Sequence, residues 1–192
     1  MVNVIKYQDI LIDSISYKKI VSYKKKNLLP TFYNNNNKLL VAINSQRIYN
    51  IEISDKIIII DFEIDNDFRN FLIDLNQKNM EYIKNNSKKW IRKDQNFSIE
   101  NNNNNNLILK KNTSKTILQF KILIDQLTCD IPLQVFDKNK NKISIFEINK
   151  NDNVQLLLEY NGLLFDKDFK FEPLFNILQL RITKKIQDFE KV

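Results

Sequence analysis

Residues 38–64 read KLLVAINSQRIYNIEISDKIIIIDFEI, and this stretch decides the class of the fold. It contains three short runs rich in β-branched residues, Lys38–Ile43, Arg47–Ile53 and Lys56–Ile64. Asn-Ser and Ser-Asp pairs, which are typical of turns, separate the runs. In the third run acidic residues alternate with apolar ones, as in a strand that has one solvent-exposed face and one buried face. The stretch therefore predicts three consecutive antiparallel strands.

The period of the apolar residues changes directly after this stretch. They now recur at the spacing of one face of a helix, namely at Phe68, Phe71, Leu72, Leu75, Tyr82 and Ile83. Asp65 or Asp67 can cap the amino end of such a helix. Its last turns carry several lysines and arginines, which complement the negative end of the helix dipole. We predict a helix over residues 67–92.

Further strands are predicted on both sides of this helix. They are Val4–Ile12 before it and Ile117–Ile124, Leu133–Phe136, Ile143–Phe146, Val154–Tyr160 and Leu174–Ile182 after it. Lys138–Lys142 forms the turn of one hairpin, and Gly162 supplies a bulge or tight turn. Strands around one central helix, without an internal repeat, predict a mainly β single domain over residues 1–192. A partly closed antiparallel barrel or sandwich fits this order.

Composition removes several classes of active site. The chain has no histidine, one cysteine (Cys129) and one glycine (Gly162). A structural zinc site, an imidazole-assisted nucleophile and a glycine-rich phosphate loop all need residues that are missing here. We expect a non-enzymatic protein without a cofactor or a metal.

Targeting signals and low-complexity tracts say less about function. The sequence has neither a signal-peptide pattern nor a long apolar run, so we expect a soluble, cytoplasmic protein without membrane contact. Asparagine is used 29 times. The Asn-rich segment 94–107 is interpreted as a solvated loop insertion.

The positive charge of the chain is segregated. Residues 14–51 contain no Asp or Glu, and their net charge of +7 equals that of the whole protein. The cations are Lys18, Lys19, Lys24, Lys25, Lys26, Lys38 and Arg47, and the aromatic residues among them are Tyr17, Tyr23, Phe32, Tyr33 and Tyr49. Lysine and arginine follow a phosphate backbone, and exposed rings stack on unpaired bases. We call residues 17–37 the basic arm; the alternative is a solvated loop whose lysines only favour solubility.

A second basic cluster follows the predicted helix. The segment from Lys84 to Lys121 contains nine lysines and arginines but only two acidic residues, Asp94 and Glu100. Trp90 lies in this cluster and can stack a base beside Lys88, Lys89 and Arg92. The alternative, which the helical spacing from Ile83 favours, is that Trp90 packs on the sheet.

Four carboxylates offer a different chemistry. Asp61, Glu63, Asp65 and Asp67 fall on alternate positions and can bind magnesium, as in a nuclease. The simpler interpretation is a solvated strand face followed by a helix cap.

Several segments resemble a known family. They are Lys38-Leu39-Leu40-Val41, the helix from Phe68-Arg69-Asn70-Phe71-Leu72 to Asn86-Ser87-Lys88-Lys89-Trp90, and Leu156 to Phe165 with Ile177 to Ile182. Together they resemble the OB-fold single-stranded DNA-binding proteins of nucleocytoplasmic large DNA viruses and of virus-like cytoplasmic linear plasmids. The resemblance implies an OB-like antiparallel barrel, elaborated by additional strands and a helix. It also implies sequence-independent coating of single strands during DNA replication. Phe165 stands near the position where that family carries a stacking tryptophan.

The residues and the resemblance lead to one prediction, a single-stranded DNA-binding protein. The predicted contacts are Lys18, Lys19, Tyr23, Lys24, Lys25, Lys26, Phe32, Tyr33, Arg47, Tyr49, Lys88, Lys89, Arg92 and Phe165. Single-stranded DNA is the expected partner, RNA is a second one, and replication proteins or further copies of the chain are compatible with it. One rival is a protein-interaction or structural subunit of a viral-type transcription or virion complex. The other is a nuclease that uses the carboxylates between Asp61 and Asp67.

Overall fold

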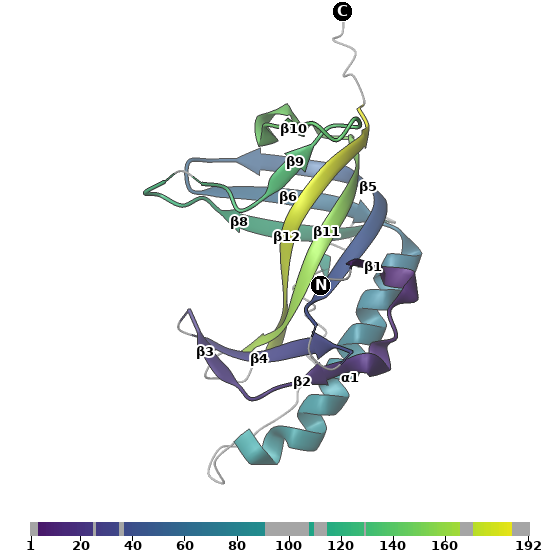
Figure 1. The fold of residues 1–192 in the computed structure, drawn as a ribbon, viewed down its shortest axis with the longest axis vertical. Helices are drawn as coiled ribbons and strands as arrows, with labels where there is room; N and C mark the ends of the chain where they lie inside the picture. Colours follow the sequence, from purple (N-terminus) through teal and green to yellow (C-terminus); the bar gives the residue numbers. More distant parts are fainter. Residues whose placement is uncertain are drawn as a thin grey trace, which may run out of the picture.

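The computed structural model describes residues 4–24, 26–34, 37–90, 108–109, 115–128, 130–165 and 171–185, and only the backbone at 87–90 and 108–109. These residues form twelve strands and one α-helix (Figure 1). The first strands are β1 (Val4–Lys6), β2 (Ile15–Tyr17), β3 (Val21–Tyr23), β4 (Lys26–Tyr33), β5 (Leu39–Ile53) and β6 (Ile57–Ile64). Helix α1 (Asn66–Trp90) follows, and then β7 (Ile108–Leu109), β8 (Thr116–Leu123), β9 (Gln134–Phe136), β10 (Lys142–Ile143), β11 (Asn153–Phe165) and β12 (Phe171–Lys184).

The main sheet has the strand order β10-β9-β12-β11-β5-β6-β8-β7. Most neighbours are antiparallel, but β1 pairs with β5 and β9 pairs with β12 in parallel. The sheet is therefore mixed, and its path among the described strands is not closed. The predicted class, a mainly β, OB-like fold with one central helix, is confirmed.

Strand β5 differs from the prediction at Asn44-Ser45. The predicted turn is absent, and a single strand runs through from Leu39 to Ile53. The buried Gln46 explains the local irregularity, because its amide donates to Asn44 O at 2.7 Å and to Asp65 Oδ2 at 3.0 Å. The pairing of β5 with β11 shifts register at this point. Asn44-Ser45 thus marks a bulge rather than a turn.

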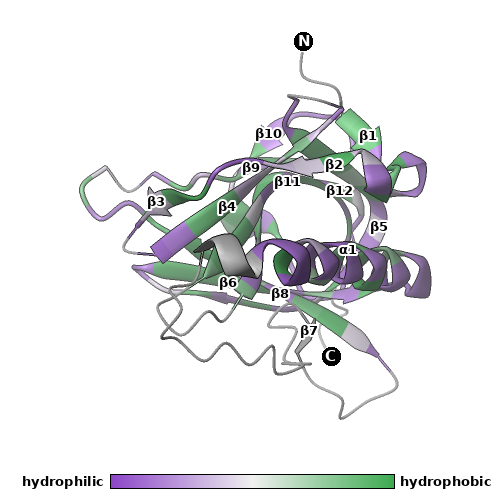
Figure 2. Ribbon diagram, turned by 90° about the horizontal axis from the view of Figure 1, so that it is seen from below, coloured by the Kyte–Doolittle hydropathy of each residue, from purple (hydrophilic) through white to green (hydrophobic). Residues whose placement is uncertain are grey.

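Helix α1 matches its prediction closely. The backbone N–H of Phe68 donates to Asp65 Oδ1 at 2.7 Å, so Asp65 is the cap. The predicted stripe is the buried face, with Phe68 and Ile83 both fully buried. In Figure 2, which views the molecule from below, α1 lies in front of the strands. The helix face turned toward the viewer is mostly hydrophilic. None of the described helices is long and apolar enough to cross a membrane.

Two other predicted strands are wrong in part. The chain leaves β1 after Lys6 and forms 3₁₀ turns, because the ring of Tyr7 packs on Phe68 with centroids 5.2 Å apart. The segment predicted as Ile143–Phe146 is a strand only through Ile143. Ser144 then caps a 3₁₀ turn, η3 (Ile145–Glu147). In this capping box Glu147 Oε1 accepts the backbone N–H of Ser144 at 3.0 Å.

The hairpin of β11 and β12 joins the two ends of the molecule. Residues Asn153–Tyr160 of β11 pair with β5, whereas Gly162–Phe165 pair with β4. Gly162 lies at the junction of the stretches that pair with β5 and β4, at a register shift in the pairing of β11 with β12, and has φ +126°. The predicted bulge at Gly162 is confirmed. Figure 1 shows the result: β11 and β12 run from β9 at one end of the long axis down to β3 and β4 at the other.

Candidate nucleic-acid interface

The basic arm is folded as strands rather than as a loop. Tyr17 of β2 pairs with Thr31 of β4, and the N–H of Lys18 donates to Pro30 O at 3.0 Å. Strand β3 pairs with the first residues of β4. Because β4 is in turn bonded to β11, the cations of the arm are attached to the main sheet by backbone hydrogen bonds.

The arm also packs on the second half of α1. The ring of Tyr17 stacks on that of Tyr82 with centroids 3.9 Å apart, and the Tyr17 hydroxyl donates to Asn79 Oδ1 at 2.7 Å. The hydroxyl of Tyr160 on β11 donates to the same oxygen at 3.0 Å. Burial raises the pKa of the Tyr17 phenol far above its ordinary value, and Tyr82 and Glu81 add to the rise. The phenol therefore stays a neutral donor, and the contact fixes the arm against the helix.

A pocket of about 750 Å³ opens where the arm meets the helix. It is lined by Tyr17, Lys18, Lys19, Val21, Pro30, Phe32, Tyr82 and Asn86. These lining residues combine three aromatic rings with two lysines and include no carboxylate. Lys18 Nζ lies 3.8 Å from the centre of the Phe32 ring, a cation–π contact that holds both side chains at the pocket.

The structure thus brings together three of the predicted contact residues, Lys18, Lys19 and Phe32. Tyr23 and Lys24 lie at the adjoining β3–β4 turn, where Lys24 Nζ is 5.5 Å from the centre of the Tyr23 ring. Lys26 donates to Glu172 of β12, so its charge is already matched by a carboxylate. Lys25 and Arg92, the side chains of Lys88, Lys89 and Trp90, and the segment 94–107 lie outside the described residues.

Two predicted stacking rings are wrong. Tyr33 is only 5% exposed, and its hydroxyl accepts the N–H of Leu11 at 3.2 Å. Phe165 is 3% exposed and packs against Phe171, with ring centroids 5.0 Å apart. Both rings are core residues, because the strand face on which each lies is turned inward. Neither presents a free face to a base.

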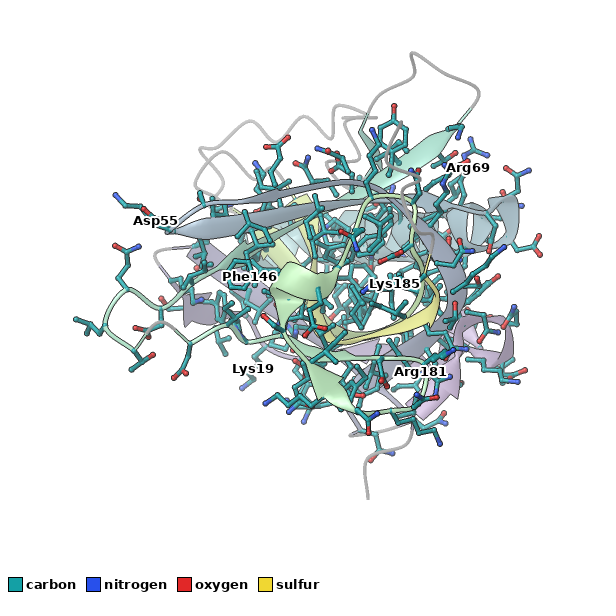
Figure 3. The ribbon with its side chains drawn as sticks, turned by 90° about the horizontal axis from the view of Figure 1, so that it is seen from above. Lys19, Asp55, Arg69, Phe146, Arg181 and Lys185 are labelled. Atoms are coloured by element: carbon teal, nitrogen blue, oxygen red, sulfur yellow. The ribbon has the colours of Figure 1, made fainter. Side chains whose placement is uncertain are left out.

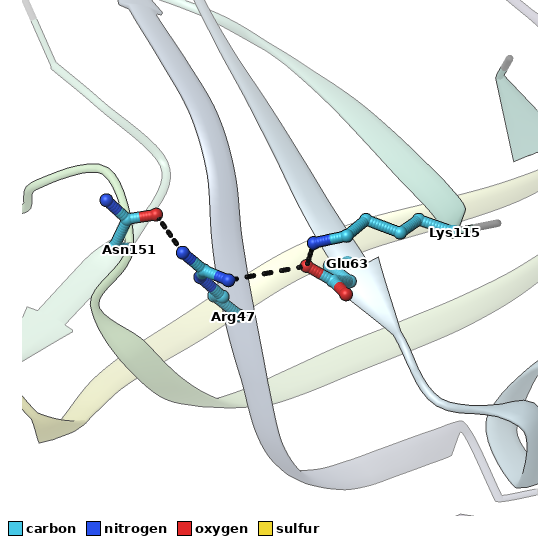
Figure 4. Close-up of polar contacts among 4 residues, drawn as sticks. All are labelled: Arg47, Glu63, Lys115 and Asn151. Atoms are coloured by element: carbon cyan, nitrogen blue, oxygen red, sulfur yellow. Dashed lines mark hydrogen bonds and ion pairs between the residues drawn. The ribbon is translucent and has the colours of Figure 1, made fainter. Parts of the chain in front are cut away.

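Arg47 and Tyr49 lie on a separate part of the surface. Arg47 donates to Asn151 Oδ1 and has Nη1 3.9 Å from Glu63 Oε2 (Figure 4). Lys115 Nζ approaches the same Glu63 oxygen at 2.8 Å. The ring of Tyr49 is 37% exposed. These two residues follow β5 away from the pocket, so the structure does not join them to the arm.

Three of the four carboxylates considered for magnesium, those of Asp61, Glu63 and Asp65, have partners within the protein. Asp61 accepts from Gln119 at 2.8 Å, Glu63 is paired with Lys115, and Asp65 caps α1. In the part of the chain that the structure describes, no three His, Cys, Asp or Glu side chains are grouped to hold a metal ion.

Sequence reasoning missed Tyr82 and Asn86 as pocket residues. Tyr82 belongs to the apolar stripe of the helix, and this periodicity predicted a core position. The hydroxyl of Tyr82 distinguishes it from the apolar residues of the stripe. A buried tyrosine needs a polar neighbour for its hydroxyl or an edge that reaches solvent. Only the fold shows that Tyr17, far away in the sequence, lies across from it.

Comparison with known proteins gives a family and a fold. Residues 45–191 match the family of unknown function DUF5871, and the chain belongs to this family. A search of curated proteins found no match.

Among solved structures, gp2.5, a single-stranded DNA-binding protein encoded by bacteriophage T7, superposes with a TM-score of 0.50 at 11% sequence identity. The match covers 80% of this chain and 91% of gp2.5. The single-stranded DNA-binding protein from bacteriophage Enc34 gives a TM-score of 0.47 at 11% identity, over 91% of this chain and 94% of that protein. At such identities the likeness to gp2.5 shows the fold alone.

Proposed function

We propose that this member of the DUF5871 family binds single-stranded DNA without sequence preference, through the pocket between the basic arm and α1. The observation that carries the proposal is the composition of that pocket, in which Lys18 and Lys19 stand beside Tyr17, Phe32 and Tyr82. The lysines hold phosphates, and an aromatic ring of the pocket stacks on a base.

The chemistry of the pocket favours single strands over duplexes. Bases in a duplex have their faces covered by their neighbours, so a ring in a pocket gains nothing from them. The face of an aromatic ring can stack on any base, and lysine interacts with the phosphate charge rather than with the edges of the bases. The pocket therefore supports binding that depends on strandedness and salt but not on sequence.

The fold agrees with this proposal but does not carry it, since one fold supports many functions. T7 gp2.5, which shares the OB-like architecture, is described as a single-stranded DNA-binding protein. We extend the proposal to a non-catalytic role in which the protein coats exposed strands during the replication of a viral or linear-plasmid genome in the cytoplasm.

The test removes the cations and the ring separately. Lys18→Ala/Lys19→Ala should flatten the slope of log K against log salt for an oligo-dT by roughly 1.4, because each phosphate contact with a single strand contributes about 0.7. Phe32→Ala should cost about 1–3 kcal/mol of binding free energy. Fluorescence anisotropy gives both numbers.

The matched control is Lys6→Ala/Lys56→Ala, which removes two exposed lysines that do not line the pocket. The control should bind like the unchanged protein, and all variants should melt within a few degrees of it. If the pocket variants and the control behave alike, the pocket is not the binding site.

A further inference from the structure

A second groove, of about 410 Å³, lies on the outer face of the main sheet. Two rows of paired side chains cross its floor. Gln155, Arg181 and Phe136 form one row across β11, β12 and β9, and Leu157 and Gln179 lie side by side in the next. Residues opposite each other on neighbouring strands have Cβ atoms about 5 Å apart, so their relative positions are set by backbone pairing.

The charge of this groove is positive. Arg181 of β12 and Lys140 of the β9–β10 turn line it, and no carboxylate does so among the described residues. The acid in that turn, Asp137, has its carboxylate engaged by the turn itself, where it accepts the N–H groups of Asn139 and Asn141 at 2.8 Å each. The cations therefore face the groove without a competing anion on its walls.

The groove also has an apolar part and a polar part suited to a nucleotide. Phe136 and Leu157 offer apolar surface, whereas Gln155 and Gln179 carry amides that can bond to the edge of any base. Arg181 donates to the side-chain oxygen of Gln155, which holds the guanidinium across the sheet. This bond uses one of the five N–H donors of an arginine. The volume is within the usual range for a small-molecule site.

We propose that this groove is a second contact for the same DNA strand, in which Arg181 and Lys140 bind a phosphate and Phe136 contacts a base. The inference rests on the proposed function and names the path of the strand over the protein. Sequence reasoning had treated Lys138–Lys142 only as a turn.

The separation of the two sites fits one continuous strand. Pro30 of the first pocket pairs with Gly162 of β11, and Gln155 of the groove lies seven residues earlier on the same strand. At about 3.3 Å per residue this is roughly 23 Å, or about seven stacked nucleotides at 3.4 Å each. Single OB folds bind about 4–16 nucleotides. Figure 3 shows Lys19 and Arg181 on the same side of the molecule, away from Arg69.

Oligonucleotide length tests the proposal. An oligo-dT of about 5 nucleotides is too short to reach both sites, whereas one of about 20 spans them. Arg181→Gln/Lys140→Gln should leave the affinity for the short oligonucleotide unchanged. It should weaken binding of the long one by at least about tenfold and flatten its salt slope by roughly 1.4. Lys6→Gln/Lys56→Gln is the matched control and should change neither.

Crosslinking gives a second readout that does not depend on affinity. A 20-nucleotide strand containing 5-iododeoxyuridine should crosslink to the peptide that contains Phe136, and Phe136→Leu should abolish this product while the protein still melts cooperatively. Binding of the 20-nucleotide strand by the Arg181→Gln/Lys140→Gln variant as tightly as by the unchanged protein, or no crosslink at Phe136, would overturn the second contact alone. Failure of the unchanged protein to bind either length would instead refute the proposed function.

Discussion

At the scale of single residues, Asn79 joins three elements. Its side-chain oxygen accepts hydroxyl protons from Tyr17 of the arm and Tyr160 of β11, while Asn79 itself belongs to α1 and is fully buried. Removing one buried partner costs more than the net value of the bond, because the hydroxyls that remain lose their acceptor. Asn79 therefore stabilises the wall of the first pocket through both tyrosines.

Asn79→Ala should lower the free energy of unfolding by about 2–4 kcal/mol, since it removes the acceptor of two hydroxyls, the buried one of Tyr160 and the half-buried one of Tyr17. Tyr17→Phe, which removes one bond and leaves the second tyrosine satisfied, should cost about 0.5–1.5 kcal/mol. Urea denaturation measures both values, and Asn70→Ala, at an exposed position of the same helix, is the control. Equal stability of the Asn79 and Asn70 variants would contradict this role.

Glu159 gives a pH-dependent prediction. Burial raises the pKa of its carboxyl, but hydrogen bonds from Lys38, at 2.6 Å, and from Asn161 outweigh burial and hold the pKa below its ordinary value of 4.5. A carboxyl with a lowered folded-state pKa stabilises the protein above its unfolded pKa, and this contribution is lost as pH falls through the folded pKa.

The difference in unfolding free energy between the unchanged protein and Glu159→Gln should therefore be constant above about pH 5.5 and shrink below pH 4.5. Asp55→Asn, at an exposed turn, should show no such trend. Denaturation series at several pH values decide the matter, and a difference that does not vary with pH would show that the ion pair has no linked proton.

At the scale of elements, Gly162 attaches the arm to the main sheet. A Cβ at this position would lie 2.1 Å from Leu29 O of β4, and its φ of +126° is one that other residues rarely adopt. The clash must be relieved by moving β4 away from β11, and the strained φ of residue 162 adds a separate cost.

Gly162→Ala should thus cost at least about 3 kcal/mol of stability. It should also weaken DNA binding at temperatures where the variant is still folded, because β4 carries Phe32. Asn161→Ala next to it, where the backbone φ is not positive, should cost less, about 1.5 kcal/mol, since it removes only the hydrogen bond to Glu159. Thermal melts and binding assays on the two variants test this, and a Gly162 variant with normal stability would refute it.

The sequence predicts elements well where one periodicity dominates. The apolar stripe from Phe68 to Ile83 predicts α1, because residues at helical spacing are the ones that the fold buries. Asp65, directly before the helix, predicts its cap. Prediction fails where a local signal competes with a tertiary one. Asn44-Ser45 has the composition of a turn, but β5 pairs with β11 on both sides of it, so the strand continues through a bulge.

Site residues are harder to predict than elements, since composition does not show which face of a strand is buried. Tyr33 and Phe32 are neighbours in β4, yet alternation places the first in the core and the second at the pocket. Arm and helix meet through Tyr17 and Tyr82, and no local pattern contains this contact. The window of segregated charge, residues 14–51, contains Lys18, Lys19 and Phe32, which line the pocket, and its role as a nucleic-acid contact stays a prediction.

At the scale of the whole molecule, the fold arranges two positive, ring-containing surfaces along one hairpin. The first pocket lies where the basic arm meets α1, and the groove lies over β9, β11 and β12. Figure 1 shows β4 near one end of β11 and β9 near the other. Under the proposed function, the net charge of +7 attracts any nucleic acid, whereas only the rings distinguish single strands from duplexes. Strandedness is therefore the property that separates specific binding from general attraction.

The most direct measurement is the affinity of the unchanged protein for two ligands, each at two salt concentrations. One ligand is a 20-nucleotide oligo-dT, and the other is the duplex that this strand forms with oligo-dA. Binding to the single strand should be at least about tenfold tighter at both concentrations, because base stacking adds about 1–3 kcal/mol per base and a duplex does not offer it. Both affinities should fall as salt rises, since both include phosphate contacts. Equal affinity for the two forms, or no binding of the single strand, would contradict single-strand recognition.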